Sequence, residues 1–387
     1  SHSRFLFAPS LRSGMEIIMQ KIFAIIRQDP VLLVSGILAA LSMLLVPPDE
    51  AYLSYIDFRV LALLFSLMCV MNGFQEIGLF EKTAVWILRR TRNTRQLSAV
   101  LIFLCFFFSM VITNDVALIT FVPFTVLILN LTGKKGLLIY VIVLQTIAAN
   151  LGSMLTPIGN PQNLYLYSLS GMSFPAFIRT MLPYTLLSFL LLLLALFMKK
   201  KEPVSAEALA SVPFRGKKEL FALYLFLFLL CLGCVLRFLS WPLILACTLA
   251  GLLLFNRSLL KKADYGLLAT FVFFFLFIGN MGRLPAVADL LGRMLAGREL
   301  WISVLACQVI SNVPAAILLS GFTSDYTALL IGVNLGGLGT LIASLASLIS
   351  YKQYARVEGS RKGRYLLAFS CLNLLFLLLL LAAARAL

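Results

Sequence analysis

The sequence contains little charge and almost no histidine. Of its 387 residues, 12% are Asp, Glu, Lys or Arg and 61% are hydrophobic, whereas soluble domains carry roughly 25% charged residues. So apolar a chain has too little polar surface to stay in water, which excludes a soluble globular enzyme. The single histidine, His2, lies in a short leader at the N-terminus, which argues against a catalytic site built on histidine.

Acidic residues are also scarce, with 16 Asp and Glu against 32 Lys and Arg. In a soluble protein this excess of basic residues would suggest binding to nucleic acid. Here, however, the basic residues lie in short loops between apolar runs. Cytoplasmic loops of membrane proteins collect Lys and Arg in this way. We therefore expect no nucleic-acid partner and an integral protein of the lipid bilayer, in a bacterial inner membrane, with a cytoplasmic N-terminus and an external C-terminus.

Long apolar runs dominate the chain, many of them near the roughly 20 residues needed to cross a bilayer. The nine expected crossings are 31–47, 58–80, 136–168, 176–198, 219–238, 242–256, 264–284, 328–350 and 365–387. Two further stretches, 97–130 and 299–322, are interrupted at the centre by polar residues. We interpret both as re-entrant hairpins, because non-helical backbone at membrane depth is tolerated only inside protein or beside a cavity.

The two halves of the chain repeat the same motifs in the same order. The matching pairs are Ile112-Thr113-Asn114 with Ile310-Ser311-Asn312, Asn150-Leu151-Gly152 and Thr156 with Asn334-Leu335-Gly336 and Thr340, and Asn72 with Asn280. Each repeat has four crossings and one hairpin, and the extra crossing between them inverts the second repeat. Inverted repeats with interrupted helices are typical of secondary transporters.

This duplication predicts an all-α polytopic membrane protein of two inverted repeats, each with a re-entrant hairpin and a broken transmembrane helix. The expected parts are a leader and interfacial segment over 1–30, a first repeat over 31–198, a cytoplasmic linker over 199–218, a linking transmembrane helix over 219–240 and a second repeat over 241–387. Whether 15–26 contributes to a span stays open.

The first hairpin carries Thr113-Asn114-Asp115 at its centre. Backbone N–H groups that begin its second arm attract anions, and carbonyls that end its first arm coordinate cations; the alternative is that these residues only cap the second arm. Ionisable groups inside a membrane are functional by default. Since an ionised Asp115 would repel an anion, it predicts proton coupling, a neutral substrate or a cation site. The second hairpin, with Ser311-Asn312-Val313, has no acid there.

Two helices are also broken within the expected membrane region. The stretch from Thr156 to Asn163 contains two prolines and a glycine, which leave backbone carbonyls free. Those carbonyls, with Asn160 and Asn163, could hold an ion or a substrate. The corresponding stretch from Thr340 to Ser347 keeps hydroxyls but has no proline, so close packing of small residues is an alternative there.

The expected site residues therefore lie at the hairpin tips and helix breaks. The substrate-binding set is Thr113, Asn114, Asp115, Asn160, Asn163, Ser311, Asn312, Thr340 and Ser344. The ion-coupling set is Asp115, Asn114, Gly159, Asn312 and Asn334, and a sodium ion is expected, where one couples, at Thr113, Asn114 and Gly159. We expect no cofactor beyond a coupling H⁺ or Na⁺.

At these residues the chain resembles the ion transporter superfamily, which includes divalent-anion/sodium symporters, citrate-transporter-like permeases, arsenite pumps and certain sodium/proton antiporters. That group has a Ser-Asn-Thr motif at each hairpin tip, matched here by Thr113-Asn114-Asp115 and Ser311-Asn312-Val313, and a proline-asparagine turn matched by Asn160-Pro161-Gln162-Asn163. The resemblance implies that the hairpin tips and the turns of the broken helices bind substrate and coupling cations. It also implies elevator-like transport and favours a homodimer. Asp115 and Val313 depart from the carboxylate–sodium symporters, so the pattern is closer to the arsenite and antiporter branch.

The leading hypothesis is an elevator-type, alternating-access transporter of a small anion, such as a carboxylate or an inorganic oxyanion, coupled to protons or sodium. The alternatives are an arsenite or antimonite efflux permease and a sodium/proton antiporter. An ion channel, a candidate from a different class of membrane protein, would need no coupling ion. An enzyme is not expected, because an intramembrane active site needs a nucleophile beside a base, and the chain offers no histidine or Ser/Lys pair at membrane depth.

Overall fold

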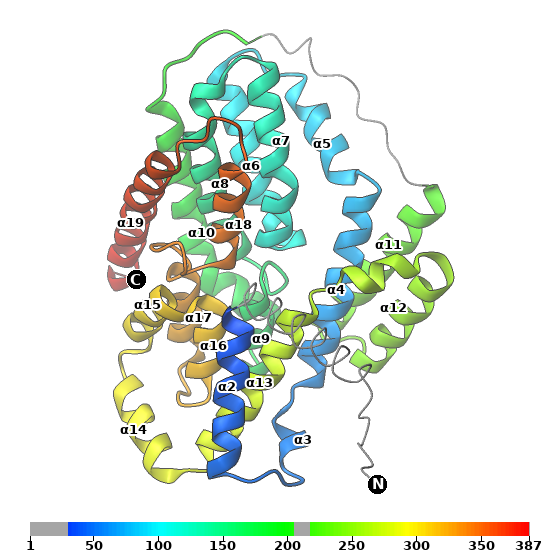
Figure 1. Ribbon diagram of the computed structural model, residues 1–387, viewed down its shortest axis with the longest axis vertical. Helices are drawn as coiled ribbons and strands as arrows, with labels where there is room; N and C mark the ends of the chain where they lie inside the picture. The colour runs from blue at the N-terminus through cyan, green and yellow to red at the C-terminus, as the bar shows by residue number, and fades with distance from the viewer. Residues whose placement is uncertain (1–29, 205–216, 387) are drawn as a thin grey trace, which may run out of the picture.

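A computed structural model describes residues 30–204 and 217–386 of the chain (Figure 1). The expected leader and interfacial segment, including 15–26, and most of the expected linker lie outside the described residues. Over the described ranges all regular structure is helical, apart from one isolated bridge between Asn93 and Pro203. The predicted all-α class is therefore confirmed.

Eight of the described helices are long and apolar enough to cross a membrane. They are α4 (Phe58–Glu76), α6 (Thr94–Ile112), α7 (Asn114–Leu131), α8 (Leu138–Ser153, extended by the 3₁₀ turn Lys135–Leu137), α10 (Phe174–Phe197), α11 (Lys218–Val235), α13 (Tyr265–Gly282) and α19 (Lys362–Ala386). The protein is thus a polytopic membrane protein, as predicted.

Shorter helices complete the described chain. They are α2 (Pro30–Leu45), α3 (Tyr52–Tyr55), α5 (Leu79–Leu88), α9 (Pro161–Ser170), α12 (Trp241–Phe255), η2 (Arg257–Lys262), α14 (Pro285–Leu295), α15 (Glu299–Ile310), α16 (Asn312–Ser320), α17 (Tyr326–Leu335) and α18 (Leu345–Ala355). Four of them, α3, α5, η2 and α14, are absent from the sequence-based expectation. Of these, α5 and α14 each stand directly before a hairpin.

The helices follow the same order in the two halves of the chain. The matching pairs are α4 with α13, α5 with α14, α6 with α15, α7 with α16, α8 with α17, α9 with α18 and α10 with α19. Even the caps agree: Asp57 and Asp264 precede α4 and α13 with nearly the same backbone angles, and each side chain accepts the N–H three residues on. The second copy of this helix order supports the predicted duplication.

Polar residues break the helices where the sequence places them. A single residue separates the arms of each hairpin, Thr113 between α6 and α7 and Ser311 between α15 and α16. Both have positive φ, 75° and 76°, with ψ of 151° and 158°, a region that is essentially limited to glycine. After the break between α8 and α9, Pro161 is the first residue of α9. Its missing N–H costs nothing there, because the first N–H groups of a helix have no partner within the helix.

The breaks meet near the middle of the molecule. In Figure 1, α6 and α7 run from the top toward the centre, and α15 and α16 approach the centre from below. The most buried of the spanning helices is α8, which packs against α6, α7, α10, α18 and α19. On another side of the molecule, α11 and α12 pack against α4, and α2 packs against α13.

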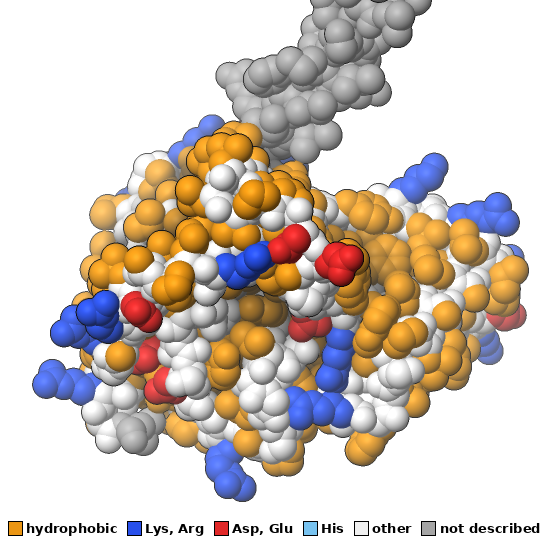
Figure 2. Space-filling view, turned by 90° about the horizontal axis from the view of Figure 1, so that it is seen from below, with side chains coloured by type: hydrophobic (Ala, Val, Ile, Leu, Met, Phe, Trp, Pro, Cys, Tyr) orange, Lys and Arg blue, Asp and Glu red, His pale blue; other side chains and the backbone are white. Residues whose placement is uncertain are grey.

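The outer surface is strongly apolar. Figure 2 shows hydrophobic side chains over much of the face seen from below. Leu44, Phe238 and Leu254 are 79%, 82% and 77% exposed. So much exposed apolar surface would drive association in water, whereas it is compatible with lipid chains.

Candidate functional site

The first hairpin tip is bonded to the break between α8 and α9. The backbone N–H of Asn114 donates to the carbonyl of Gly159 at 3.1 Å, and the side-chain amide of Asn114 donates to Oδ1 of Asn150 at 3.0 Å. Near the end of α6, the carbonyl of Met110 accepts the Thr156 hydroxyl at 2.5 Å. The tip and the break therefore form one hydrogen-bonded unit.

The second tip repeats this arrangement with the break between α17 and α18. The N–H of Asn312 donates to the carbonyl of Ala343 at 2.9 Å. The hydroxyl of Thr340 donates to the carbonyl of Gln308 at 3.1 Å, and the amide of Gln308 donates to the carbonyl of Gly336 at 2.9 Å. The bond between Thr340 and Gln308 corresponds to the bond between Thr156 and Met110 in the first half.

Most backbone donors at the two tips are already used. The N–H of Asp115 donates to Oδ1 of Asn114 at 3.0 Å, and the N–H of Val313 donates to Oδ1 of Asn312 at 2.9 Å. The next residue of the second arm is Pro314, which has no N–H. The side chains of Asn114 and Asn312, the first residues of α7 and α16, thus accept an N–H of the first turn of their own helices, and few amide donors are left there to attract an anion.

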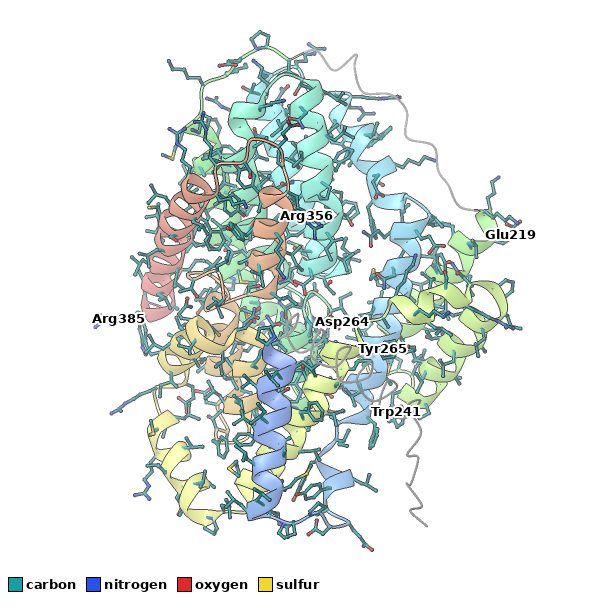
Figure 3. The ribbon with its side chains drawn as sticks, in the orientation of Figure 1. Glu219, Trp241, Asp264, Tyr265, Arg356 and Arg385 are labelled. Carbon is teal, nitrogen blue, oxygen red and sulfur yellow. The ribbon has the colours of Figure 1, made fainter. Side chains whose placement is uncertain are left out.

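Asp115 does not occupy the N-cap position of α7. It lies in the first turn of α7, whereas the cap residue is Thr113. Among the described residues, Oδ1 of Asp115 is buried and has no hydrogen-bond partner, an arrangement that is costly in a protein interior. Asp264, labelled in Figure 3, directly precedes α13. Its carboxylate interacts electrostatically with Asp115. A proton, a cation or a donor group of a solute would complete this position.

Three asparagines join the two halves of the chain. Nδ2 of Asn160 donates to Oδ1 of Asn334 at 3.3 Å, and Nδ2 of Asn334 donates to Oδ1 of Asn163 at 2.7 Å. All three side chains are at most 3% exposed. Nδ2 of Asn163 also lies 3.1 to 3.3 Å from the carbonyls of Ser153, Met154 and Thr156. The carbonyls freed by the break are therefore satisfied by Asn163.

A second link between the halves centres on Asn150, which is not among the residues expected at the site. Its Oδ1 accepts the Ser344 hydroxyl at 3.0 Å, and its Nδ2 donates to the Ser347 hydroxyl at 3.4 Å. The same Oδ1 accepts from Asn114. The internal repeat could have identified Asn150, because it occupies the position of Asn334 in the other half.

Most of the expected site residues therefore belong to connected hydrogen-bond networks. Gly159 and Asn114, expected to hold sodium with Thr113, are bonded to each other. Ser344 directly follows Ala343, the partner of the second tip. Thr340 is exposed but bonded to Gln308, whereas Oδ1 of Asp115 has no hydrogen-bond partner among the described residues.

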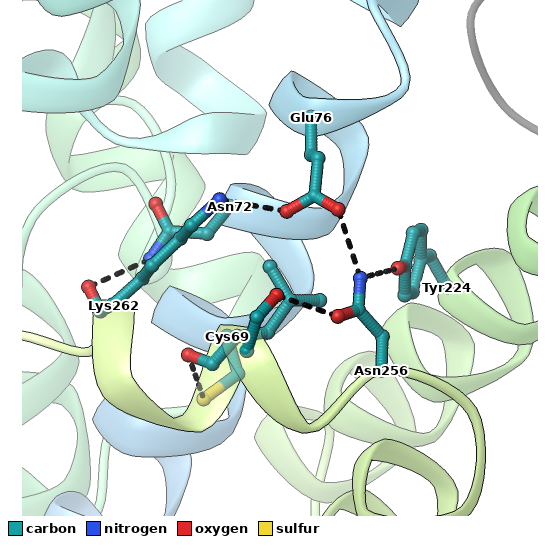
Figure 4. A network of polar contacts seen from close by, with 8 residues as sticks. Cys69, Asn72, Glu76, Tyr224, Asn256 and Lys262 are labelled. Atoms are coloured by element: carbon teal, nitrogen blue, oxygen red, sulfur yellow. Dashed lines mark hydrogen bonds and ion pairs between the residues drawn. The ribbon is translucent and has the colours of Figure 1, made fainter.

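Another polar network lies at the end of α4 (Figure 4). Glu76 forms an ion pair with Lys262 at 2.7 Å, and Asn256 donates to Glu76 and to the Tyr224 hydroxyl, both at 3.0 Å. Asn72 donates to the carbonyl of Lys262 at 3.0 Å. These contacts fasten α4 to α11 and η2.

Membrane-spanning helices, with two helix breaks joined by buried polar side chains, define a membrane transporter, and comparison with known proteins agrees. The chain belongs to the citrate transporter family, whose model matches residues 16–324. This membership confirms the resemblance to the ion transporter superfamily.

Several named relatives are also transporters or membrane proteins. The uncharacterized transporter MJ0456 of Methanocaldococcus jannaschii is 33% identical over 90% of this chain and 95% of its own length. The inner membrane protein YbiR of Escherichia coli is 32% identical over 77% of this chain and 80% of its own. The silicon efflux transporter LSI3 of Oryza sativa subsp. japonica is 32% identical over 39% of this chain and 31% of its own.

Proposed function

We propose that this protein is a secondary active transporter that works by elevator-type alternating access and carries a small anion, such as a carboxylate or an inorganic oxyanion, with protons or sodium. One observation carries the proposal. Each half of the chain contributes a hairpin tip bonded to a helix break, and buried asparagines join the two breaks. A site between two related halves is the arrangement that alternating access requires.

The opposite approach of the two hairpins supports an inverted repeat. In Figure 1, α6 and α7 lie in the upper part of the molecule, whereas α15 and α16 lie in the lower part. Two related halves of opposite orientation supply two related gates, one for each side of the membrane. The membership in the citrate transporter family favours an anionic substrate. We place the protein in a bacterial inner membrane with its N-terminus in the cytoplasm.

A second candidate is the efflux of an uncharged hydroxide such as arsenite or antimonite. The unpaired oxygen of Asp115 favours it, because an ionised carboxylate accepts a hydrogen bond from a hydroxyl but repels an anion. The scarcity of unused amide donors at the tips points the same way. One relative is named as a silicon efflux transporter. A sodium/proton antiporter would use Asp115 without any other solute.

Purified protein in liposomes would test these candidates. Labelled citrate, phosphate and arsenite are offered in turn under a proton or a sodium gradient, with a pH-sensitive dye inside the vesicles. Citrate or phosphate uptake that collapses with the gradient supports the anion transporter, and arsenite movement alone supports the second candidate. Protein that moves none of these solutes, and no protons when sodium is added, would contradict a coupled transporter.

A further inference from the structure

Three loops at one end of the molecule gather basic residues into a single surface. Residues 89–95, 134–135 and 199–202 contain nine Lys and Arg and one acid, Glu202. The chain fastens these loops together: the N–H of Thr94 donates to the carbonyl of Glu202 at 2.9 Å, and Lys134 forms an ion pair with the Glu202 side chain at 2.5 Å. We call these three loops the basic surface.

The basic surface lies at the edge of the membrane-spanning part of the protein. Four spanning helices begin or end beside it: the start of α6, the end of α7, the start of the 3₁₀ turn before α8, and the end of α10 (Figure 1). Helices of this length end where the hydrocarbon of the bilayer ends. At the end of α10, Leu194, Phe197 and Met198 are 64%, 64% and 79% exposed and share one helix face. An exposed apolar face therefore adjoins the cations directly.

Most of these cations have no acidic partner in the described parts of the chain. Glu202 is already paired with Lys134. Within residues 30–204 and 217–386, no ion pair involves Arg90, Arg92, Arg95, Lys199, Lys200 or Lys201. Like charges repel one another, so the fold gathers charge that an anion would neutralise. The sorting of Lys and Arg to one side of a membrane requires only that they lie in loops on that side. It does not require loops far apart in sequence to be bonded together.

Arg95 lies where these loops meet and is held in place by the chain. Its Nη2 donates to the carbonyl of Lys199 at 3.1 Å, and its Cζ lies over the ring of Phe197, 4.9 Å from the ring centroid. Its Nε is buried and has no hydrogen-bond partner among the described residues. The guanidinium is thus fixed beside the apolar face of α10 with a donor that the protein does not use. The planar donor fork of a guanidinium matches the oxygens of a phosphate group.

We propose that the basic surface binds an anionic phospholipid. The lipid phosphate contacts Arg95 and the neighbouring cations, and an acyl chain lies along Leu194, Phe197 and Met198 at the end of α10. The exposed apolar face beside the cations favours a lipid, since a free phosphate or an acidic peptide would use the cations alone. The surface is at the opposite end of α6 from the hairpin tip, and the proposal does not depend on the proposed transport function.

The test is a lipid titration of the purified protein in detergent, followed by its Tm. Dioleoylphosphatidylglycerol is the anionic probe, and dioleoylphosphatidylcholine, which has the same acyl chains, is the control lipid. A ligand that binds the folded protein raises Tm with its concentration, so each titration gives an apparent Kd. Each titration is run at low and at high NaCl.

Two triple variants separate this surface from the net charge of the protein. The surface variant removes three exposed cations that form no ion pair among the described residues, Arg92→Gln, Lys200→Gln and Lys201→Gln. The matched control variant makes the same change of charge at three exposed lysines of the α11 and η2 region, Lys217→Gln, Lys218→Gln and Lys261→Gln.

We expect phosphatidylglycerol to raise Tm more than phosphatidylcholine does. Each cation near an anionic lipid surface contributes about fivefold to the binding constant, so the surface variant should weaken phosphatidylglycerol binding by about 100-fold. The control variant should change it by less than about threefold, and high NaCl should weaken it, because salt screens exposed and distant charges. Arg95→Lys keeps the charge but loses the donor fork, and should weaken binding by about 3- to 10-fold.

Several results would overturn the inference. Equal rises in Tm with the two lipids show no preference for an anionic headgroup, and equal losses of affinity in the two triple variants show only an effect of net charge. A rise in Tm with inorganic phosphate that the surface variant abolishes shows a site for a soluble anion instead. If the surface variant does not fold, Arg92→Gln alone should still weaken phosphatidylglycerol binding by about fivefold, and unaltered binding by this single variant contradicts the proposal.

Discussion

Replacing Asn163 by leucine should destabilise the protein by about 3 kcal/mol. The substitution nearly preserves volume, so the loss comes from hydrogen bonds. Oδ1 of Asn163 accepts from Asn334 at 2.7 Å, and Nδ2 is shared among three carbonyls at 3.1 to 3.3 Å. Two lost bonds contribute about 1 kcal/mol each, and carbonyls left unpaired in a buried place add a similar amount. That sum changes the unfolding equilibrium by more than about 100-fold.

The assay is equilibrium unfolding of purified protein, with Asn373→Leu as the control. Asn373 is equally buried, but its side chain makes a single bond, to the Phe369 carbonyl of its own helix, and its Oδ1 has no partner in the described part of the chain. The control should cost less than about 1 kcal/mol. If the two variants lose the same stability, the bonds of Asn163 do not hold the break together and the reasoning is refuted.

Three further substitutions test other parts of the structure. Gly159→Ala should reduce stability and yield, since its Cβ would lie 2.0 Å from a backbone carbonyl, whereas Gly136→Ala, with nothing within 4 Å, should be neutral in a thermal-unfolding assay. Thr113→Gly should raise stability by about 1 kcal/mol, because it relieves backbone strain; a lower Tm would disprove the strain. The hydrogen bond from Lys134 lowers the pKa of Glu202 below its ordinary 4.5, so this pair stabilises the folded state above that pH and is lost as pH falls through the lowered pKa. The Tm difference between wild type and Glu202→Gln should therefore be present above pH 4.5 and shrink as pH falls below it; a difference that does not change with pH contradicts the pairing.

The positions of the helices could be predicted from the sequence to a large extent. Membrane helices are long and uniformly apolar, so their polar interruptions stand out, and Thr113 and Ser311 do separate helical arms. The short helices α5 and α14 escaped prediction because they are too short to cross a membrane, and α14 mixes apolar with charged residues.

The directions of the side chains could not be predicted in the same way. Asn163 was expected to help hold a ligand, but in the structure it satisfies the carbonyls that the break leaves free. Asn150 and Gln308 bond across segments that are far apart in sequence, and such pairings depend on tertiary packing. A motif indicates where a helix breaks, whereas packing decides which amide faces the site.

The asparagine link between the two breaks has a consequence for the moving parts of a transport cycle. Asn160, Asn163 and Asn334 are bonded in a place with almost no access to water, so separating them would leave several amides unpaired at once. In the proposed transport cycle, we therefore expect this link to stay intact. Both interrupted helices would then move as one rigid body. The sliding interface would lie where α9 packs against α4 and α16 packs against α13.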